Sequence, residues 1–263
     1  MSSSHDDVLR ASASKASQTR SAMLASGFLS GGLLALATLF AWKGTSGLSA
    51  ESAATLSGLL FPAGFAIISL LGLDLITGNL ALLPYGALYG EVPWHKVGRS
   101  FLWVTVGNLV GSLFVGLVFA FTASHGTFHD TDFLIHKTKL ICESKTVFYA
   151  NLGVVGWFTA FLKAVLCNWM VALASVLAVT SKQEVTKIFA TWLPIAIFFT
   201  LGYEHLVVNF FVIPAGILLG AKPSIVEAII WNFIPVLLGN AVGAFLLVTI
   251  PMRLANGSRS TSP

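Results

Sequence analysis

The chain has 263 residues, of which 56% are hydrophobic and only 10% are charged, and its mean hydropathy is +0.83. So few charged residues cannot cover the surface of a water-soluble domain, so the composition excludes that class and indicates an integral membrane protein. The net charge of +4 is interpreted as a signal of membrane orientation, and we expect no nucleic-acid partner.

Residues 1–22 form a polar, mildly basic segment, which we interpret as a cytoplasmic amphipathic segment. Six apolar stretches follow, each near the roughly 20 residues that a helix needs to cross a bilayer. They cover about 23–42, 53–89, 101–123, 159–180, 188–219 and 226–252, and the second and fifth are long and interrupted. Residues 124–148 are expected to be a solvated loop, and 254–263 a polar tail. The prediction is a single all-α transmembrane domain, residues 23–253.

The distribution of lysine and arginine predicts the orientation, because short cytoplasmic loops are enriched in them. With six spans both termini share one side, and that side carries nine of the Lys and Arg residues near the membrane, against five on the other. We therefore expect both termini in the cytoplasm and favour the plasma membrane, with an organellar membrane as the alternative.

A fifteen-residue pattern, G-x-[D/E]-x4-N-x4-P-x-G, occurs twice, 130 residues apart. The copies read GLDLITGNLALLPYG from Gly72 and GYEHLVVNFFVIPAG from Gly202, and a G-N-x-V-G block follows each copy. Each half, about 23–123 and 159–253, contains three predicted spans, so the second half must enter the membrane from the opposite face. The sequence predicts an inverted 3+3 repeat with spans two and five broken, an arrangement that marks a transport site near the midplane.

The positions shared by the two copies are interpreted as structural. Gly72 and Gly202 permit the turn out of the first half-helix, and Asn79 and Asn209 are expected to cap the start of the second. Asp74 and Glu204 are acids inside the membrane, where an unpaired charge is costly. We interpret them mainly as acceptors of hydrogen bonds that order the loop, with direct proton transport as the alternative.

The positions at which the copies differ point to function. His205 stands where the first copy has Leu75, and Thr77 stands where the second has Val207. His205 is the one histidine of six inside a predicted span, and an ionisable group there is a functional candidate by default, although a buried histidine can also be structural.

Four segments together resemble the formate/nitrite transporter family: LDLITGN in the first repeat, CNWMVALA at 167–174, GYEHLVVNFFVIPAG, and NFIPVLLGNAVGA at 232–244. The resemblance covers nearly the whole chain. It implies an aquaporin-like fold assembled as a homopentamer with one pore in each protomer. It also implies passage of small monovalent anions or their conjugate acids, namely formate, nitrite, lactate or hydrosulfide.

The resemblance also implies roles for individual residues. His205 resembles the central pore histidine and Thr77 the threonine that faces it, while Asn168 and Asn209 match the pore asparagines. Lys15 lies where the family has a basic residue near the inner mouth. The positions that match the apolar constrictions are Phe61, Phe65, Leu75, Val171 and Phe198, and Phe65 is larger than the leucine common there.

Lys163 interrupts the fourth span a little over one turn before Asn168. It is interpreted either as a lysine that extends to the interface or as a cation that raises the anion concentration in the outer vestibule.

The predicted function is pH-dependent passage of a small monovalent anion, with or without a proton, across the bilayer. An anion that enters hydrocarbon must find donors or be neutralised, and His205 can donate a proton near neutral pH. Nitrite or formate is favoured, and a proton-coupled lactate transporter or a neutral-solute channel is the alternative. We expect no enzymatic activity, no cofactor and no metal, since no second intramembrane histidine accompanies Glu204 and His205.

Overall fold

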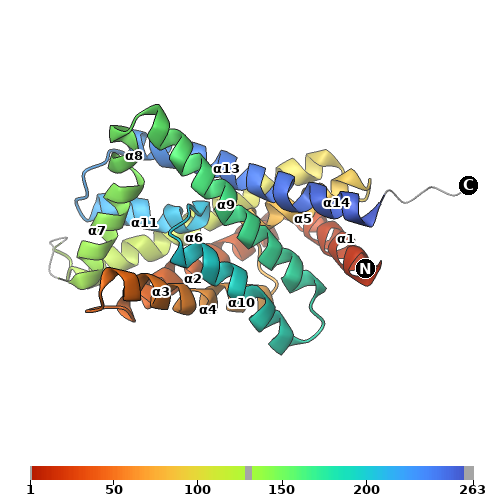
Figure 1. Ribbon diagram of the computed structural model, residues 1–263, viewed down its shortest axis with the longest axis horizontal. Coiled ribbons are helices and arrows are strands. Elements are labelled where there is room, and N and C mark those ends of the chain that lie inside the picture. The colour runs from red at the N-terminus through yellow and green to blue at the C-terminus, as the bar shows by residue number, and fades with distance from the viewer. Residues whose placement is uncertain (1, 128–131, 258–263) are drawn as a thin grey trace, which may run out of the picture.

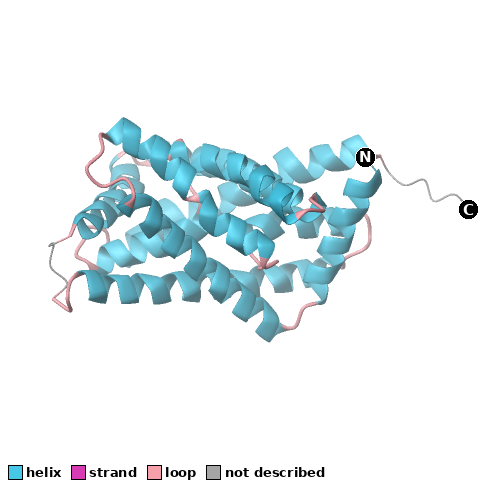
Figure 2. Ribbon diagram, turned by 90° about the horizontal axis from the view of Figure 1, so that it is seen from below, coloured by secondary structure: helices cyan, strands magenta, loops and turns pink. Residues whose placement is uncertain are grey.

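The computed structural model describes residues 2–127 and 132–257, and all regular structure within them is helical (Figures 1 and 2). The first half contains α1 (Ser2–Ser17), α2 (Arg20–Lys43), α3 (Ala50–Leu60), α4 (Pro62–Leu70), α5 (Ile76–Leu88) and α6 (Trp94–Ala123). The second half contains α7 (Phe133–Lys145), α8 (Val147–Asn151), α9 (Val154–Thr180), α10 (Glu184–Thr200), α11 (Leu206–Leu218), α12 (Ile225–Ala228), α13 (Ile234–Ala244) and α14 (Ile250–Asn256). Two π-helical turns, Ile229–Phe233 and Phe245–Thr249, join α12, α13 and α14 into one helical stretch.

Five helical stretches in the described part of the chain are long and apolar enough to cross a membrane. They are Arg20–Lys43, Ala50–Leu70, Trp94–Ala123, Val154–Thr180 and Ile225–Asn256, and Leu206–Leu218 is a shorter apolar helix. The expectation of an all-helical chain with several long apolar stretches is thereby confirmed. The predicted stretch 188–219 is divided between α10 and α11, and neither helix alone reaches the length of a full span.

The helices form an elongated bundle in which α1, α5 and α14 lie at one end and α7 and α8 at the other (Figure 1). The expectation of a solvated loop at 124–148 was wrong for its second half, because residues 133–151 form α7 and α8. Ile135 and Cys142 of α7 are fully buried, and the Cys142 thiol donates to the Ile213 carbonyl of α11 at 3.5 Å. The connection thus packs onto the bundle through an apolar face of α7. That face was not recognised in the sequence because the segment also carries many polar residues.

Glycines allow two helix pairs to approach until their backbones touch. A Cβ at Gly31 of α2 would lie 2.2 Å from the Asn108 carbonyl oxygen of α6, and one at Gly111 would lie 2.0 Å from the Phe28 carbonyl oxygen. In the second half a Cβ at Gly243 of α13 would lie 2.2 Å from the Val165 carbonyl oxygen of α9. Contacts between small residues are a common way to pack membrane helices closely. They also bring the polar side chains of α6 and α13 within reach of the bundle interior.

We predict that Gly111→Ala lowers the free energy of unfolding by about 1–3 kcal/mol, because the new methyl group meets main chain that cannot move aside. Thermal unfolding of the detergent-solubilised protein measures the effect. Gly98→Ala in the same helix is the matched control, since nothing lies within 4 Å of a Cβ at Gly98. Equal melting temperatures for Gly111→Ala and wild type would contradict the close approach of α2 and α6.

Candidate functional site

Two short non-helical segments interrupt the bundle, one between α4 and α5 and one between α10 and α11. Each has a glycine of positive φ as its second residue, Gly72 at +66° and Gly202 at +63°, a conformation that side chains with a Cβ rarely adopt. In the first segment the Leu73 N–H donates to the Ile68 carbonyl at 3.0 Å, and in the second the Tyr203 N–H donates to the Phe198 carbonyl at 3.1 Å. The two segments therefore use the same turn.

Asparagines of the G-N-x-V-G blocks hold both interruptions. The Asn108 Oδ1 accepts from the Ile76 N–H at 2.9 Å, and its Nδ2 donates to the Asp74 carbonyl at 3.1 Å. Asn240 does the same for the second segment, with bonds to the Leu206 N–H at 3.0 Å and to the Glu204 carbonyl at 3.0 Å. These asparagines were not among the predicted site residues, although the repetition of their block was the signal that could have identified them.

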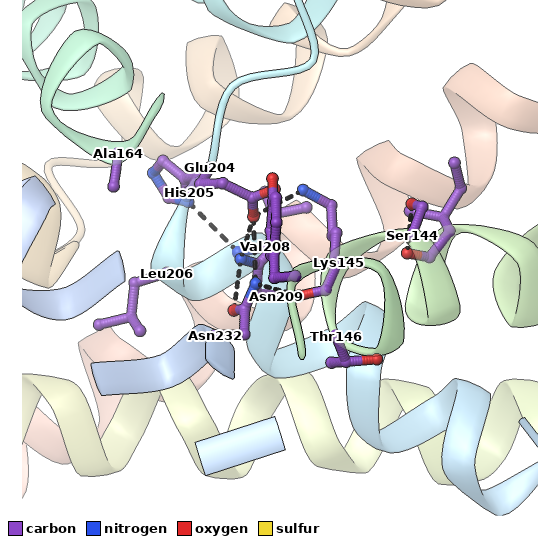
Figure 3. Close-up of polar contacts among 12 residues, drawn as sticks. Ser144, Lys145, Thr146, Ala164, Glu204, His205, Leu206, Val208, Asn209 and Asn232 are labelled. Carbon is purple, nitrogen blue, oxygen red and sulfur yellow. Dashed lines mark hydrogen bonds and ion pairs between the residues drawn. The ribbon is translucent and has the colours of Figure 1, made fainter. Parts of the chain in front are cut away.

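The expectation that Asn79 and Asn209 cap the second half-helices was wrong. Leu75 and His205 occupy the N-cap positions of α5 and α11, and the two asparagines lie inside the helices. Their amides donate instead to the acids, from Asn79 to Asp74 at 3.2 Å and from Asn209 to Glu204 at 2.8 Å. Asn209 also donates to the Asn232 Oδ1 at 2.8 Å, so it belongs to the surroundings of Glu204 (Figure 3).

Each buried acid is paired with a lysine from a helix at one end of the bundle. Lys15 of α1 lies 2.6 Å from Asp74, and Lys145 of α7 lies 2.8 Å from Glu204. The carboxylates are 1% and 2% exposed, so each charge depends on its partner. Lys145 was missed because it lies in the segment interpreted as a loop. It follows Lys15 by 130 residues, the spacing of the repeated pattern, and that spacing could have identified it.

Two further residues complete the surroundings of Glu204. The Tyr149 hydroxyl of α8 donates to the carboxylate at 2.8 Å. Asn232, in the first π-helical turn, donates to the Lys145 carbonyl at 2.9 Å and to the carboxylate at 3.3 Å. Both oxygens of Glu204 are thereby satisfied.

His205 lies at the junction of the second interruption with α11 and is 2% exposed. Its Nδ1 accepts from the Val208 N–H at 3.2 Å, and its Nε2 is 3.2 Å from the Thr77 Oγ1. Since Nδ1 is an acceptor, we assign the neutral ring with its proton on Nε2, which donates to Thr77. The ring stacks on Phe198 with centroids 5.4 Å apart. His205 and Thr77, two of the residues at which the repeats differ, thus meet across the two halves, as the family resemblance implied.

Asn168 of α9 contacts this pair through Thr77. Its Nδ2 donates to the Thr77 carbonyl at 3.1 Å and to the Asn240 carbonyl at 2.8 Å. These two bonds fix the orientation of the amide. The Asn168 Oδ1 is buried and has no hydrogen-bond partner in the described part of the chain, so the centre keeps one unused acceptor beside His205 and Thr77.

Two cavities approach this centre from the two ends of the bundle. The α1-side cavity, about 170 Å³, is lined by Lys15, Phe65, Leu75, Asn79, Ser175 and Lys187 among others. The α7-side cavity, about 380 Å³, is lined by Trp42, Lys145, Tyr149, Lys163, Phe198, Glu204 and His205 among others.

The five residues predicted to form constrictions are all buried, and three of them line one of these two cavities. Phe65 and Leu75 lie on the α1-side cavity and Phe198 on the α7-side cavity. Phe61 lies behind Phe198 and stacks on Phe199 with centroids 4.0 Å apart. Val171 lies one turn from Asn168 on α9. No group of three or more His, Cys, Asp or Glu side chains in residues 2–127 and 132–257 is placed to hold a metal.

Comparison with known proteins agrees with this geometry. The family model described as formate/nitrite transporter matches residues 2–254. The chain belongs to the formate/nitrite transporter family. It is 34% identical to the formate channel BtFdhC of Bacillus thuringiensis, over 90% of this chain and 87% of that one. It is 33% identical to a probable formate transporter of Methanothermobacter thermautotrophicus, over 84% of each chain.

Solved structures of the same fold cover almost the whole chain. An FNT family ion channel aligns with a TM-score of 0.82 at 21% identity, over 97% of this chain and 99% of that chain. A pentameric formate channel with formate bound aligns with a TM-score of 0.71 at 23% identity, over 90% and 97%. At these identities the likeness establishes the fold.

For this member of the formate/nitrite transporter family, we predict that Lys145→Met costs about 3–5 kcal/mol of unfolding free energy, because it leaves the Glu204 charge buried without a cation. The double variant Lys145→Met/Glu204→Gln should recover part of the loss, since it removes the stranded charge as well. Thermal unfolding of the wild type, Lys145→Met, Glu204→Gln and the double variant measures the coupling.

Lys222→Met is the control for this prediction. Lys222 pairs with Glu143 at 3.5 Å and is 77% exposed, so its loss should change stability by less than about 1 kcal/mol. Strictly additive effects in the Lys145 and Glu204 cycle would show that the pair is not coupled.

Proposed function

We propose that the protein passes small monovalent anions across a membrane in pH-dependent fashion, through a pore whose centre is His205, Thr77 and Asn168. The observation that carries the proposal is the position of this polar centre between two lysine-bearing cavities. Formate is the first candidate substrate because two of the relatives named above are a formate channel and a probable formate transporter. Nitrite, lactate and hydrosulfide are the alternatives.

We further propose the aquaporin-like inverted 3+3 architecture, with repeats at about 23–123 and 159–253 and the second and fifth spans broken. Support comes from the matching contacts of Asn108 and Asn240, and from helix direction, since α2 runs away from the end that carries α1 whereas α9 runs toward it (Figure 1). The single transmembrane domain comprises residues 23–253.

We also propose an oligomeric state and an orientation in the membrane. A solved structure of this fold is a pentamer, and we propose a homopentamer here. The excess of Lys and Arg places residues 1–22 and both termini in the cytoplasm, with the plasma membrane favoured. Of the predicted polar tail 254–263, residues 258–263 lie outside the described part of the chain.

The proposed mechanism answers the cost of moving an anion out of water. Lys163 and Lys187 draw the anion into the cavities by electrostatic attraction. Lys15 and Lys145 are bound to acids, so we assign Asp74 and Glu204 a structural role in place of proton transport. At the apolar constrictions, Phe61, Phe65, Leu75, Val171 and Phe198, water is excluded. The substrate then depends on donors at the centre.

His205 supplies the principal donor in this proposal, together with the amides at the amino terminus of α11. Its Nε2–H can turn from Thr77 to the substrate. Full transfer of this proton requires that Nδ1 gain another, and that gain removes the bond from the Val208 N–H. Because His205 does not readily give up this proton, the substrate crosses the centre most readily when it has already been protonated in solution. Acid on the entry side therefore increases flux.

His205→Phe should reduce formate flux into proteoliposomes by at least about tenfold, since a buried hydrogen-bond donor in a substrate path is worth roughly 1.5–3 kcal/mol. Thr77→Val should also alter the flux and its pH profile. The matched control is His95→Phe, because His95 is exposed at the start of α6. Unchanged flux and an unchanged pH profile in His205→Phe would refute the role of the histidine.

Competition should rank the substrates. Unlabelled formate, nitrite, lactate and hydrosulfide are added against labelled formate uptake at two pH values, and the smallest anions should compete best because the constrictions are aromatic and narrow. An osmotic-shock assay on the same vesicles tests for a neutral-solute channel. Glycerol or water flux without anion flux would overturn the proposed function.

A further inference from the structure

The two cavities differ in size and chemistry although their walls come from corresponding segments. The α7-side cavity, about 380 Å³, lies within the roughly 300–1,000 Å³ typical of ligand pockets, whereas the α1-side cavity, about 170 Å³, lies below it. The α7-side cavity carries six aromatic side chains, Trp42, Phe148, Tyr149, Phe198, Phe199 and Tyr203. Among aromatic residues, the α1-side cavity is lined by Phe65. One of the two cavities can therefore hold a ring.

The α7-side cavity also holds a cation that is not neutralised. Lys145 is bound to Glu204, whose other oxygen accepts from Tyr149. Lys163, half-buried in the wall, makes no ion pair with any carboxylate in the described part of the chain. The one acid that lines this cavity, Glu204, is saturated by its partners, so the net charge that faces a ligand here is positive.

The inner end of this cavity closes on buried side chains. Phe198 and His205 are each 2% exposed, and their rings stack on one another. The two stacked rings close this end, so a ligand with a ring of its own meets side chains there and finds no open path. A ligand with a ring would therefore occupy the cavity and stop there.

We propose that the α7-side cavity is a binding site for aromatic monocarboxylates of the phenylacetate class. The carboxylate pairs with the Lys163 ammonium, the ring packs among the aromatic side chains, and the occupied cavity blocks anion passage from that side. The site shares its cavity with the pore of the proposed function, but binding is measured directly and does not require transport.

The test is calorimetric titration of phenylacetate into the purified protein in nanodiscs. We expect saturable binding with a dissociation constant of roughly millimolar or below, as for other ligands of fragment size. Phenylacetamide has the ring without the charge, and formate has the charge without the ring, and both should bind at least about fivefold more weakly because each lacks one of the two interactions.

Variants locate the site. Lys163→Gln should weaken phenylacetate binding at least about fivefold, whereas Lys187→Gln, which removes the corresponding charge from the α1-side cavity, should leave it unchanged. Phe148→Ala is a second variant, which tests the contact with the ring and not the charge. Because Phe148 is 54% exposed, its truncation leaves the core intact. It should weaken phenylacetate more than formate.

Three outcomes would overturn the proposal: no saturable phenylacetate binding, equal binding of phenylacetamide, or equal effects of Lys163→Gln and Lys187→Gln. Block of formate flux by phenylacetate, when it is added on the α7 side alone, would support it. Intact phenylacetate binding in a protein that passes no anion would refute the proposed function and leave the binding site standing, so the two failures are distinguishable.

Discussion

The structure depends on how an open backbone is satisfied inside a membrane. Lipid offers no hydrogen bonds, so a helix can be interrupted at membrane depth only where protein groups bind the freed N–H and C=O groups. Asn108 and Asn240 do this at the two interruptions, each with one amide that accepts from the first N–H of the following helix and donates to a carbonyl within the break. The close contacts at Gly31 and Gly243 bring α6 and α13 near enough for these amides to reach. Helix packing and the formation of the site are therefore one problem.

The buried charges are also neutralised in the same way in both halves. Asp74 and Glu204 can remain ionised in the interior because Lys15 and Lys145 reach them from α1 and α7, which lie at opposite ends of the bundle (Figure 1). The acids in turn orient Asn79 and Asn209. Each interruption is thus tied to a peripheral helix through one ion pair. Displacement of that helix would leave the carboxylate buried without its cation, which is strongly destabilising.

The sequence predicted the features that depend on local or periodic chemistry. Apolar length located the helical stretches, and the repeated Gly72 and Gly202 indicated where the chain turns. It misassigned features that depend on partners distant in the chain. The amides of Asn79 and Asn209 suit helix caps as well as carboxylate donors, and only the fold decides between these uses. Lys145 is separated from Glu204 by 59 residues, and hydropathy alone cannot distinguish a solvated lysine from one that folds inward on an amphipathic helix.

The differences between the two copies carry more functional information than their similarities. Shared glycine, acid and asparagine positions build the same turn and ion pair twice, so they would give two equivalent entrances. His205 stands in the second copy where the first has Leu75, and Thr77 of the first copy contacts it. The α1-side cavity therefore ends on an aliphatic side chain, whereas the α7-side cavity ends on an imidazole held by the Val208 N–H. In the proposed pore, a substrate that enters from the α1 side must pass Leu75 before it reaches His205, and one that enters from the α7 side reaches His205 without passing Leu75. In the proposed pore, the repeated scaffold thus carries an asymmetric path, in which the imidazole of His205 faces only one of the two entrances.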